Sequence, residues 1–185
     1  LDPKKNIVYK GVDIIKKSTP VFIRKKLDYL MNFIITSNKN IEFSFLIDKV
    51  KTIKEENLLE KIENIIIPMK IENYDKYVLN DRDDIEIKKN TPIWIKGSAV
   101  YNYLLNQSNG YKNKYNLIKS GDRVKYYLTK DKEINVFSFL NGSFPIEINP
   151  PEYDYEQMFL KNFLNPLNQI LQLIYKTRVP ENLIT

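Results

Sequence analysis

The sequence predicts an α+β fold in which helices dominate. Apolar residues recur at helical spacing in four stretches, a polar turn joins two strand-like segments late in the chain, and prolines separate these elements. The chain has 185 residues, of which 43% are hydrophobic and only 5 are glycine. This is enough for one ordinary domain, or one domain with an appendage, around a real hydrophobic core.

The N-terminal half is predicted to contain an extended segment and two helices. Residues 6–17 alternate loosely and predict one or two short strands. Ser18-Thr19-Pro20 predicts a helix start, with a hydroxyl cap and proline at the first helical position, and the helix ends within residues 36–40. A second helix is predicted over residues 41–64.

The C-terminal half is predicted to contain a hairpin between two helices. Residues 65–78 read as extended or irregular because Pro68 interrupts them, and Thr91-Pro92 starts a helix that runs to Asn109-Gly110. Residues 122–129 and 134–140 predict the two strands of an antiparallel β-hairpin. After Pro150-Pro151 a last helix is predicted over residues 155–175, kinked or broken near Pro166.

Composition excludes several kinds of chemistry from this chain. Neither cysteine nor histidine occurs, so disulfides, zinc sites built on these residues, thiol nucleophiles and imidazole catalysis are ruled out. No apolar run approaches the roughly 18 residues of a spanning helix, and the first residues lack the layout of a secretory signal. We therefore expect an intracellular protein that has no membrane partner.

The net charge of +6 is unevenly distributed and indicates a polyanionic partner. Residues 1–40 carry nine basic and three acidic side chains, and residues 88–132 carry ten and two, whereas the intervening and final blocks are acidic. Such asymmetry is typical of a directed electrostatic surface, although a lysine-rich solvated surface gives the same charge.

The acidic residues do not form a convincing active site. Asp81-Arg82-Asp83-Asp84 has a spacing that could hold Mg²⁺, but no apolar strand leads into it, and a solvated loop is the favoured interpretation. The glycines are scattered singly, so no glycine-rich phosphate loop is predicted. We expect no self-contained catalytic site in this chain.

Two basic segments combine cations with groups that suit phosphate. Lys16, Lys17, Ser18 and Thr19 stand at a predicted helix start, where free N–H groups favour anions. Lys96 and Gly97 precede Tyr101-Asn102 and would bring a cation and bare backbone close together. The same basic block continues through Lys112, Lys114, Lys119, Arg123 and Lys125.

Five segments, taken in order, resemble the C-terminal part of a bacteriophage-type family B DNA polymerase. They read YKGVDIIKKSTP at residues 9–20, IIPMKIENYDKY at 66–77, TPIWIKGSAVYN at 91–102, GDRV at 121–124 and YDYEQMFLKNFLNPL at 153–167. The resemblance covers nearly the whole chain. Departures from the family pattern are Trp94 for His, Lys96 for Arg and Asn165 for Lys, and the C-terminus lacks a clamp-binding peptide, which puts clamp attachment in doubt.

The resemblance implies that residues 1–17 are the end of the polymerase palm and that residues 18–185 are the thumb. A thumb is a mainly helical domain with a small antiparallel hairpin, here preceded by a short N-terminal β segment. It grips the primer–template duplex through sequence-independent phosphate contacts. The DNA-facing residues would be Lys16, Lys17, Ser18, Thr19, Lys96, Gly97 and Tyr101, with Lys76, Lys114 and Lys125 as outer contacts, while Trp94, Phe159 and Phe163 would be core residues.

Catalysis would belong to the rest of such a polymerase. The palm aspartates that hold Mg²⁺ for nucleotidyl transfer lie in motifs that do not occur here, so this chain alone is not expected to polymerise DNA. The palm, fingers and exonuclease portion would be partners, on the same chain or a separate one, in the cytoplasm of a host cell if the source is viral. The alternative is a free-standing basic DNA-binding module that assists replication, and an enzyme based on Asp81–Asp84 is a distant third.

Overall fold

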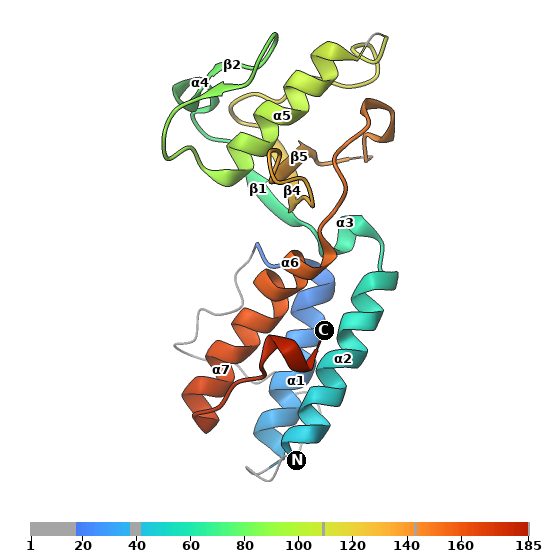
Figure 1. Ribbon diagram of the computed structural model, residues 1–185, viewed down its shortest axis with the longest axis vertical. Helices are drawn as coiled ribbons and strands as arrows, with labels where there is room; N and C mark the ends of the chain where they lie inside the picture. Colours follow the sequence, from blue (N-terminus) through green and yellow to red (C-terminus); the bar gives the residue numbers. More distant parts are fainter. Residues whose placement is uncertain (1–17, 38–41, 109, 143, 185) are drawn as a thin grey trace. The chain divides into compact units, whose positions relative to one another are not determined.

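The computed structural model describes residues 18–37, 42–108, 110–142 and 144–184, and they form two compact units. Unit 1 comprises residues up to Ile65 together with Phe159–Thr185, and unit 2 comprises Ile66–Met158. The helices and small antiparallel sheets confirm the α+β prediction (Figure 1). The predicted N-terminal strands and the boundary at residue 17 lie outside the described residues.

Unit 1 is helical and contains α1 (Val21–Thr36), α2 (Phe43–Leu59), α3 (Ile62–Ile65), the π-helical turn η2 (Leu160–Leu164), α7 (Asn165–Tyr175) and the 3-10 turn η3 (Glu181–Leu183). Residues from α1, α2, η2 and α7 share one apolar core. Phe159 and Phe163 lie in it at 1% and 0% exposure, which confirms their predicted core role. The C-terminal segment is fastened to α7 by Asn168, whose side chain exchanges two hydrogen bonds with the Val179 backbone.

The second helix departs from prediction, whereas the last helix is irregular where the sequence indicated. The expected second helix is interrupted at Glu60, whose carboxylate accepts hydrogen bonds from the Lys61 backbone and the Asn64 side chain and so ends α2 before α3 begins. In the last helix, the π-helical turn η2 separates α6 (Tyr155–Phe159) from α7 immediately before Pro166, in agreement with the predicted irregularity there. Proline cannot donate to the carbonyl four residues earlier, and a wider turn accommodates its ring.

The predicted hydroxyl caps are not formed. Pro20 and Pro92 each occupy the position that caps the helix, with extended ψ angles of 145° and 141° and no side-chain cap hydrogen bond. The Thr91 hydroxyl instead donates to the Lys88 carbonyl. The proline is itself the extended cap residue in both cases, so each helix starts one residue later than predicted.

Unit 2 is built on a three-stranded antiparallel sheet in the order β1 (Ile67–Lys70), β4 (Arg123–Leu128), β5 (Val136–Leu140). The hairpin of β4 and β5 confirms the prediction, and the Asp131 carboxylate closes its turn by accepting from the Glu133 and Ile134 backbones. Pro68 is accommodated because β1 is an edge strand. The sheet therefore joins the hairpin to a segment whose structure the sequence left open.

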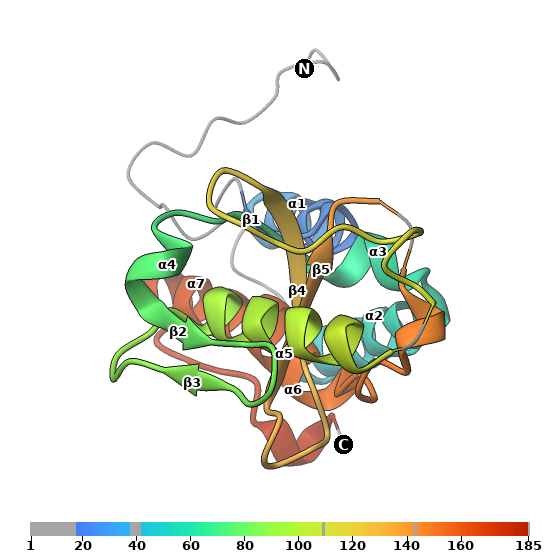
Figure 2. The same cartoon turned by 90° about the horizontal axis from the view of Figure 1, so that it is seen from above.

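Helix α5 (Ile93–Gln107) packs on one face of this sheet, chiefly against β5 (Figure 2). A Cβ atom on Gly97 would lie 2.5 Å from the Ser138 Oγ and 2.9 Å from the Phe137 carbonyl carbon. The Ser138 hydroxyl donates to the Trp94 carbonyl at 2.8 Å. Gly97 is thus the site of the close approach that the sequence indicated, and its neighbour is the protein's own strand.

The remaining elements of unit 2 surround this core. The short helix α4 (Tyr74–Tyr77) leads into a two-stranded sheet of β2 (Val78–Asn80) and β3 (Glu86–Ile87), and the 3-10 turn η1 (Ile146–Ile148) follows β5. The sheet face opposite the Ser138 side chain carries an aromatic cluster in which the Tyr127 ring contacts those of Phe137, Phe144 and Tyr153, and Phe137 also contacts Tyr101 of α5.

Gly97→Ala is expected to destabilise unit 2 by about 1–3 kcal/mol, because the added methyl group meets the backbone of β5. The fluorescence of Trp94, the chain's only tryptophan, reports the unfolding of unit 2 in denaturant. Gly142→Ala is the matched control, since nothing lies within 4 Å of a Cβ there. Equal stability of the two variants would refute the proposed packing role.

Candidate nucleic-acid interface

Three basic side chains lie together on the sheet of unit 2. Register places Lys70 of β1 directly opposite Arg123 of β4, and Lys125 is two residues further along β4, on the same face. Ser138, which faces α5, pairs with Tyr126, so Arg123 and Lys125 project from the opposite face. We call Lys70, Arg123 and Lys125 the basic strip.

The ion pair that Lys70 of the basic strip forms compensates its charge only weakly. Lys70 and Arg123 are exposed and Lys125 is half-buried. The Lys70 ammonium lies 3.7 Å from Glu72, but these side chains are 60% and 70% exposed, and such pairs contribute little. Like charges directly opposite across a sheet destabilise it by roughly 0.2–1 kcal/mol. Lys70 and Arg123 therefore present exposed positive charge at the cost of a cross-strand repulsion.

The other residues predicted to face DNA differ in their exposure and in their neighbours. Lys16 and Lys17 lie outside the described residues, and Ser18 and Thr19 are half-buried before α1, where the Thr19 carbonyl accepts from Arg24. In unit 2, Lys96 is half-buried on α5 and Lys76 is exposed on α4, with its ammonium 5.7 Å from the Tyr77 ring centroid.

Gly97 and Tyr101 are placed in the interior of unit 2. Gly97 is packed against β5, and Tyr101 is 1% exposed, with its hydroxyl donating to the Asn116 carbonyl at 3.1 Å. Burial, reinforced by the nearby Tyr115, raises the pKa of Tyr101 to about 12. The expectation that these two residues face a duplex is therefore revised, because neither offers surface to a ligand in this arrangement.

Lys114 is engaged by an acidic neighbour. Glu147 of η1 accepts from both the Lys114 ammonium and the Tyr115 hydroxyl, joining the loop after α5 to η1. Hydrogen bonds from Lys114 and Tyr115 lower the pKa of Glu147 to about 2. A phosphate would have to compete with Glu147 for Lys114, so Lys114 is a weaker candidate contact than the residues of the basic strip.

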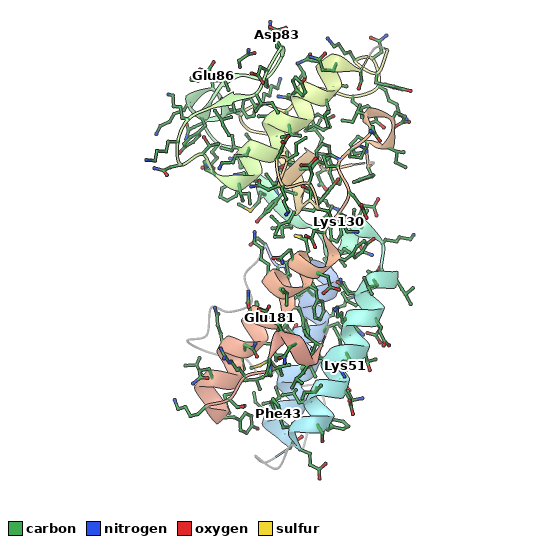
Figure 3. The ribbon with its side chains drawn as sticks, in the orientation of Figure 1. Phe43, Lys51, Asp83, Glu86, Lys130 and Glu181 are labelled. Carbon is green, nitrogen blue, oxygen red and sulfur yellow. The ribbon has the colours of Figure 1, made fainter. Side chains whose placement is uncertain are left out.

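The acidic segment 81–84 divides into a structural residue and a solvated loop. The Asp81 carboxylate accepts from the Tyr74 hydroxyl at 2.7 Å and from the Asn102 amide at 2.8 Å. Burial and this carboxylate raise the pKa of Tyr74. Asp83 and Asp84 are exposed, and Asp83 lies at the tip of the loop after β2 (Figure 3). No group of three or more acidic residues that could hold a metal ion occurs among the described residues.

Sequence reasoning placed Asn102 in a segment that suits phosphate, where the structure shows an internal role, and it missed Lys70. Asn102 is 2% exposed and bonds both backbone groups of Ile118 as well as Tyr74 and Asp81. Lys70 lies in an acidic block of the sequence, and only its register with β4 brings it to Arg123. The alternation of Arg123 and Lys125 along a predicted strand was the available signal for the basic strip.

Neither family models nor curated sequences relate this chain to a known protein. No model of a known protein family matches the chain, and no curated protein has a matching sequence. None of the helices in the described part of the chain is long and apolar enough to span a membrane.

The Glu147 contact is expected to give unit 2 a pH-dependent stability. Because the folded-state pKa lies near 2, below the ordinary value of about 4.3, the contribution is complete above the ordinary pKa and is lost as the pH falls towards 2. The difference in Tm between the wild type and Glu147→Gln should therefore be constant above about pH 5 and shrink below about pH 4. A difference that does not change with pH would contradict this assignment.

Proposed function

We propose that this chain is the thumb portion of a family B DNA polymerase and grips the primer–template duplex through phosphate contacts. The polymerase assignment rests on the collinear resemblance of five sequence segments. The contact surface rests on one structural observation, the cross-strand placement of Lys70, Arg123 and Lys125. The palm, fingers and exonuclease portion are the proposed partners, with Mg²⁺ in the palm and the host cytoplasm as location if the source is viral.

The chemistry of the basic strip favours phosphate over base edges. Lysine ammonium and arginine guanidinium groups contact phosphate oxygens whatever the base sequence. The strip lies on a sheet face, and the longest helix of unit 2, α5, is occupied by packing against the other face. A contact surface of this kind holds a duplex in register without reading its sequence, as a protein that follows a moving primer end requires.

Other basic residues of unit 2 would extend this surface. Lys96 and Lys76 remain proposed contacts, and Lys112 and Lys119 are exposed around the loop that leads to β4. Lys16, Lys17, Ser18 and Thr19 remain proposed contacts of unit 1 on the strength of the resemblance alone. The basic strip is the part of the proposed interface that can be tested separately from the fold.

Lys70→Glu is expected to weaken duplex binding with little change in stability. The substitution replaces a repulsive cross-strand pair with Arg123 by an attractive one worth roughly 0.2–1 kcal/mol, and loss of the pair with Glu72 offsets this gain. Duplex affinity, measured by fluorescence anisotropy at low salt, should fall because a phosphate contact becomes repulsive. Weaker binding accompanied by lower stability would instead indicate damage to the sheet.

Arg123→Gln combined with Lys125→Gln is expected to flatten the salt dependence of duplex binding. Each lost phosphate contact should reduce the slope of log affinity against log salt concentration by roughly 0.9, equally for unrelated DNA sequences. Lys89→Gln combined with Lys132→Gln is the control, since it removes the same charge from two exposed lysines outside the strip. Equal slopes for the two double variants would refute the proposed interface.

A polymerase thumb and a free-standing DNA-binding module differ in their need for a partner. A polymerase thumb should be captured by a palm-bearing polymerase portion, whereas an accessory module should bind the duplex without one. The pull-down should use the full chain, because the N-terminal residues carry the part of the resemblance assigned to the palm edge.

A further inference from the structure

A surface pocket of about 390 Å³ lies beside the basic strip in unit 2. Lys70 belongs to both the strip and the pocket wall, and Met69, Tyr77, Pro92 and Trp94 supply most of the remaining wall. The pocket is thus formed by β1, α4 and the start of α5, three elements that belong to the same unit. Its volume is within the range of small-molecule sites, roughly 300–1,000 Å³.

The walls combine two partly exposed aromatic rings with a cation. Tyr77 and Trp94 are neither buried nor fully exposed, so part of each side chain is open to the pocket. This revises the expectation that Trp94 is a core residue, although its ring also contacts Tyr126, with centroids 6.4 Å apart. The Lys76 ammonium lies 5.7 Å from the Tyr77 ring centroid and adds positive charge next to the pocket.

The charge and shape of the pocket define the class of its ligand. Its charged wall residues are Lys70 and Glu72, and Glu72 is 70% exposed and paired with Lys70. Lys70 is the charged residue that the pocket shares with the basic strip. Aromatic walls next to cations suit a flat ring attached to a phosphate, because stacking on Tyr or Trp accepts any base and the cations neutralise the backbone.

We propose that the pocket lined by Tyr77 and Trp94 binds an unpaired DNA base, with the phosphate attached to that base on Lys70. This inference rests on the proposed function, because it places the base at the end of the duplex that the basic strip grips. The occupant is a single-stranded segment that continues from the duplex. The pocket would therefore add a preference for a duplex with an overhang over a blunt duplex.

The intrinsic fluorescence of the full chain tests this proposal directly, because Trp94 is its only tryptophan. The chain is titrated with a blunt DNA hairpin, the same hairpin with a short thymidine overhang, and a third with an abasic overhang that keeps the phosphates. The thymidine overhang should quench Trp94 and bind about tenfold more tightly than the abasic overhang, the effect expected from one stacked base. Equal quenching and affinity for these two ligands would overturn the proposal.

Tyr77→Ala is expected to lower affinity for the thymidine overhang about tenfold and leave the blunt hairpin unaffected. Tyr111→Ala is the matched control, since Tyr111 is 37% exposed and does not line the pocket. Equal losses in both variants, or loss on the blunt hairpin as well, would contradict the stacking role. The abasic comparison uses the unaltered chain and does not depend on the folding of either variant.

The outcomes separate the pocket from the duplex-binding function. Duplex binding without a response to the overhang base would overturn the pocket and leave the proposed function standing. Quenching by the thymidine overhang without binding of the blunt hairpin would support base binding in the pocket and overturn the proposed duplex binding by the basic strip. Quenching by thymidine monophosphate as strong as that by the overhang would mean that a free nucleotide is the ligand, which contradicts the proposal as stated.

Discussion

The close packing of α5 on β5 determines the arrangement of unit 2. Gly97 allows the helix backbone to approach the strand, and the Ser138 hydroxyl fixes the contact through the Trp94 carbonyl at 2.8 Å. Once α5 occupies this face, alternation along β4 must send Arg123 and Lys125 to the other one. The same contact sets the start of α5 beside β1. One helix–strand contact therefore positions both the basic strip and the pocket wall that contains Trp94.

A buried polar network holds the connections around this core. The Asn102 side chain bonds the Ile118 backbone as a strand neighbour would, and it also reaches Tyr74 and Asp81. These partners come from the segments before and after α5, so one helical side chain anchors both. Because unpaired buried polar groups cost roughly 1–3 kcal/mol each, the network specifies these connections rather than adding general stability. In the basic strip, by contrast, the like charges of Lys70 and Arg123 lie opposite each other on an exposed surface, where their repulsion opposes folding.

Local sequence patterns predicted the positions of helices and strands better than they predicted which strands pair. Apolar periodicity located α1, α5 and the hairpin because these features depend on neighbouring residues. The interruption at Glu60 and the π-helical turn before Pro166 depend on single side-chain and backbone bonds that periodicity does not register. The pairing of β1 with β4 joins residues more than fifty positions apart. For that reason Lys125 was predicted as a contact, while Lys70 was not.

At Gly97 the sequence correctly indicated a close approach to the helix, but the approaching group is part of the protein and not DNA. A glycine within a helical pattern indicates a close approach, and the sequence resemblance assigned that approach to DNA, whereas the structure shows the neighbour to be Ser138. Removing Gly97 and Tyr101 from the proposed interface leaves cationic side chains and partly exposed aromatic rings as its components. Phosphate contacts and base stacking both tolerate any sequence. The two proposed sites can therefore act on the same DNA without requiring a particular base sequence.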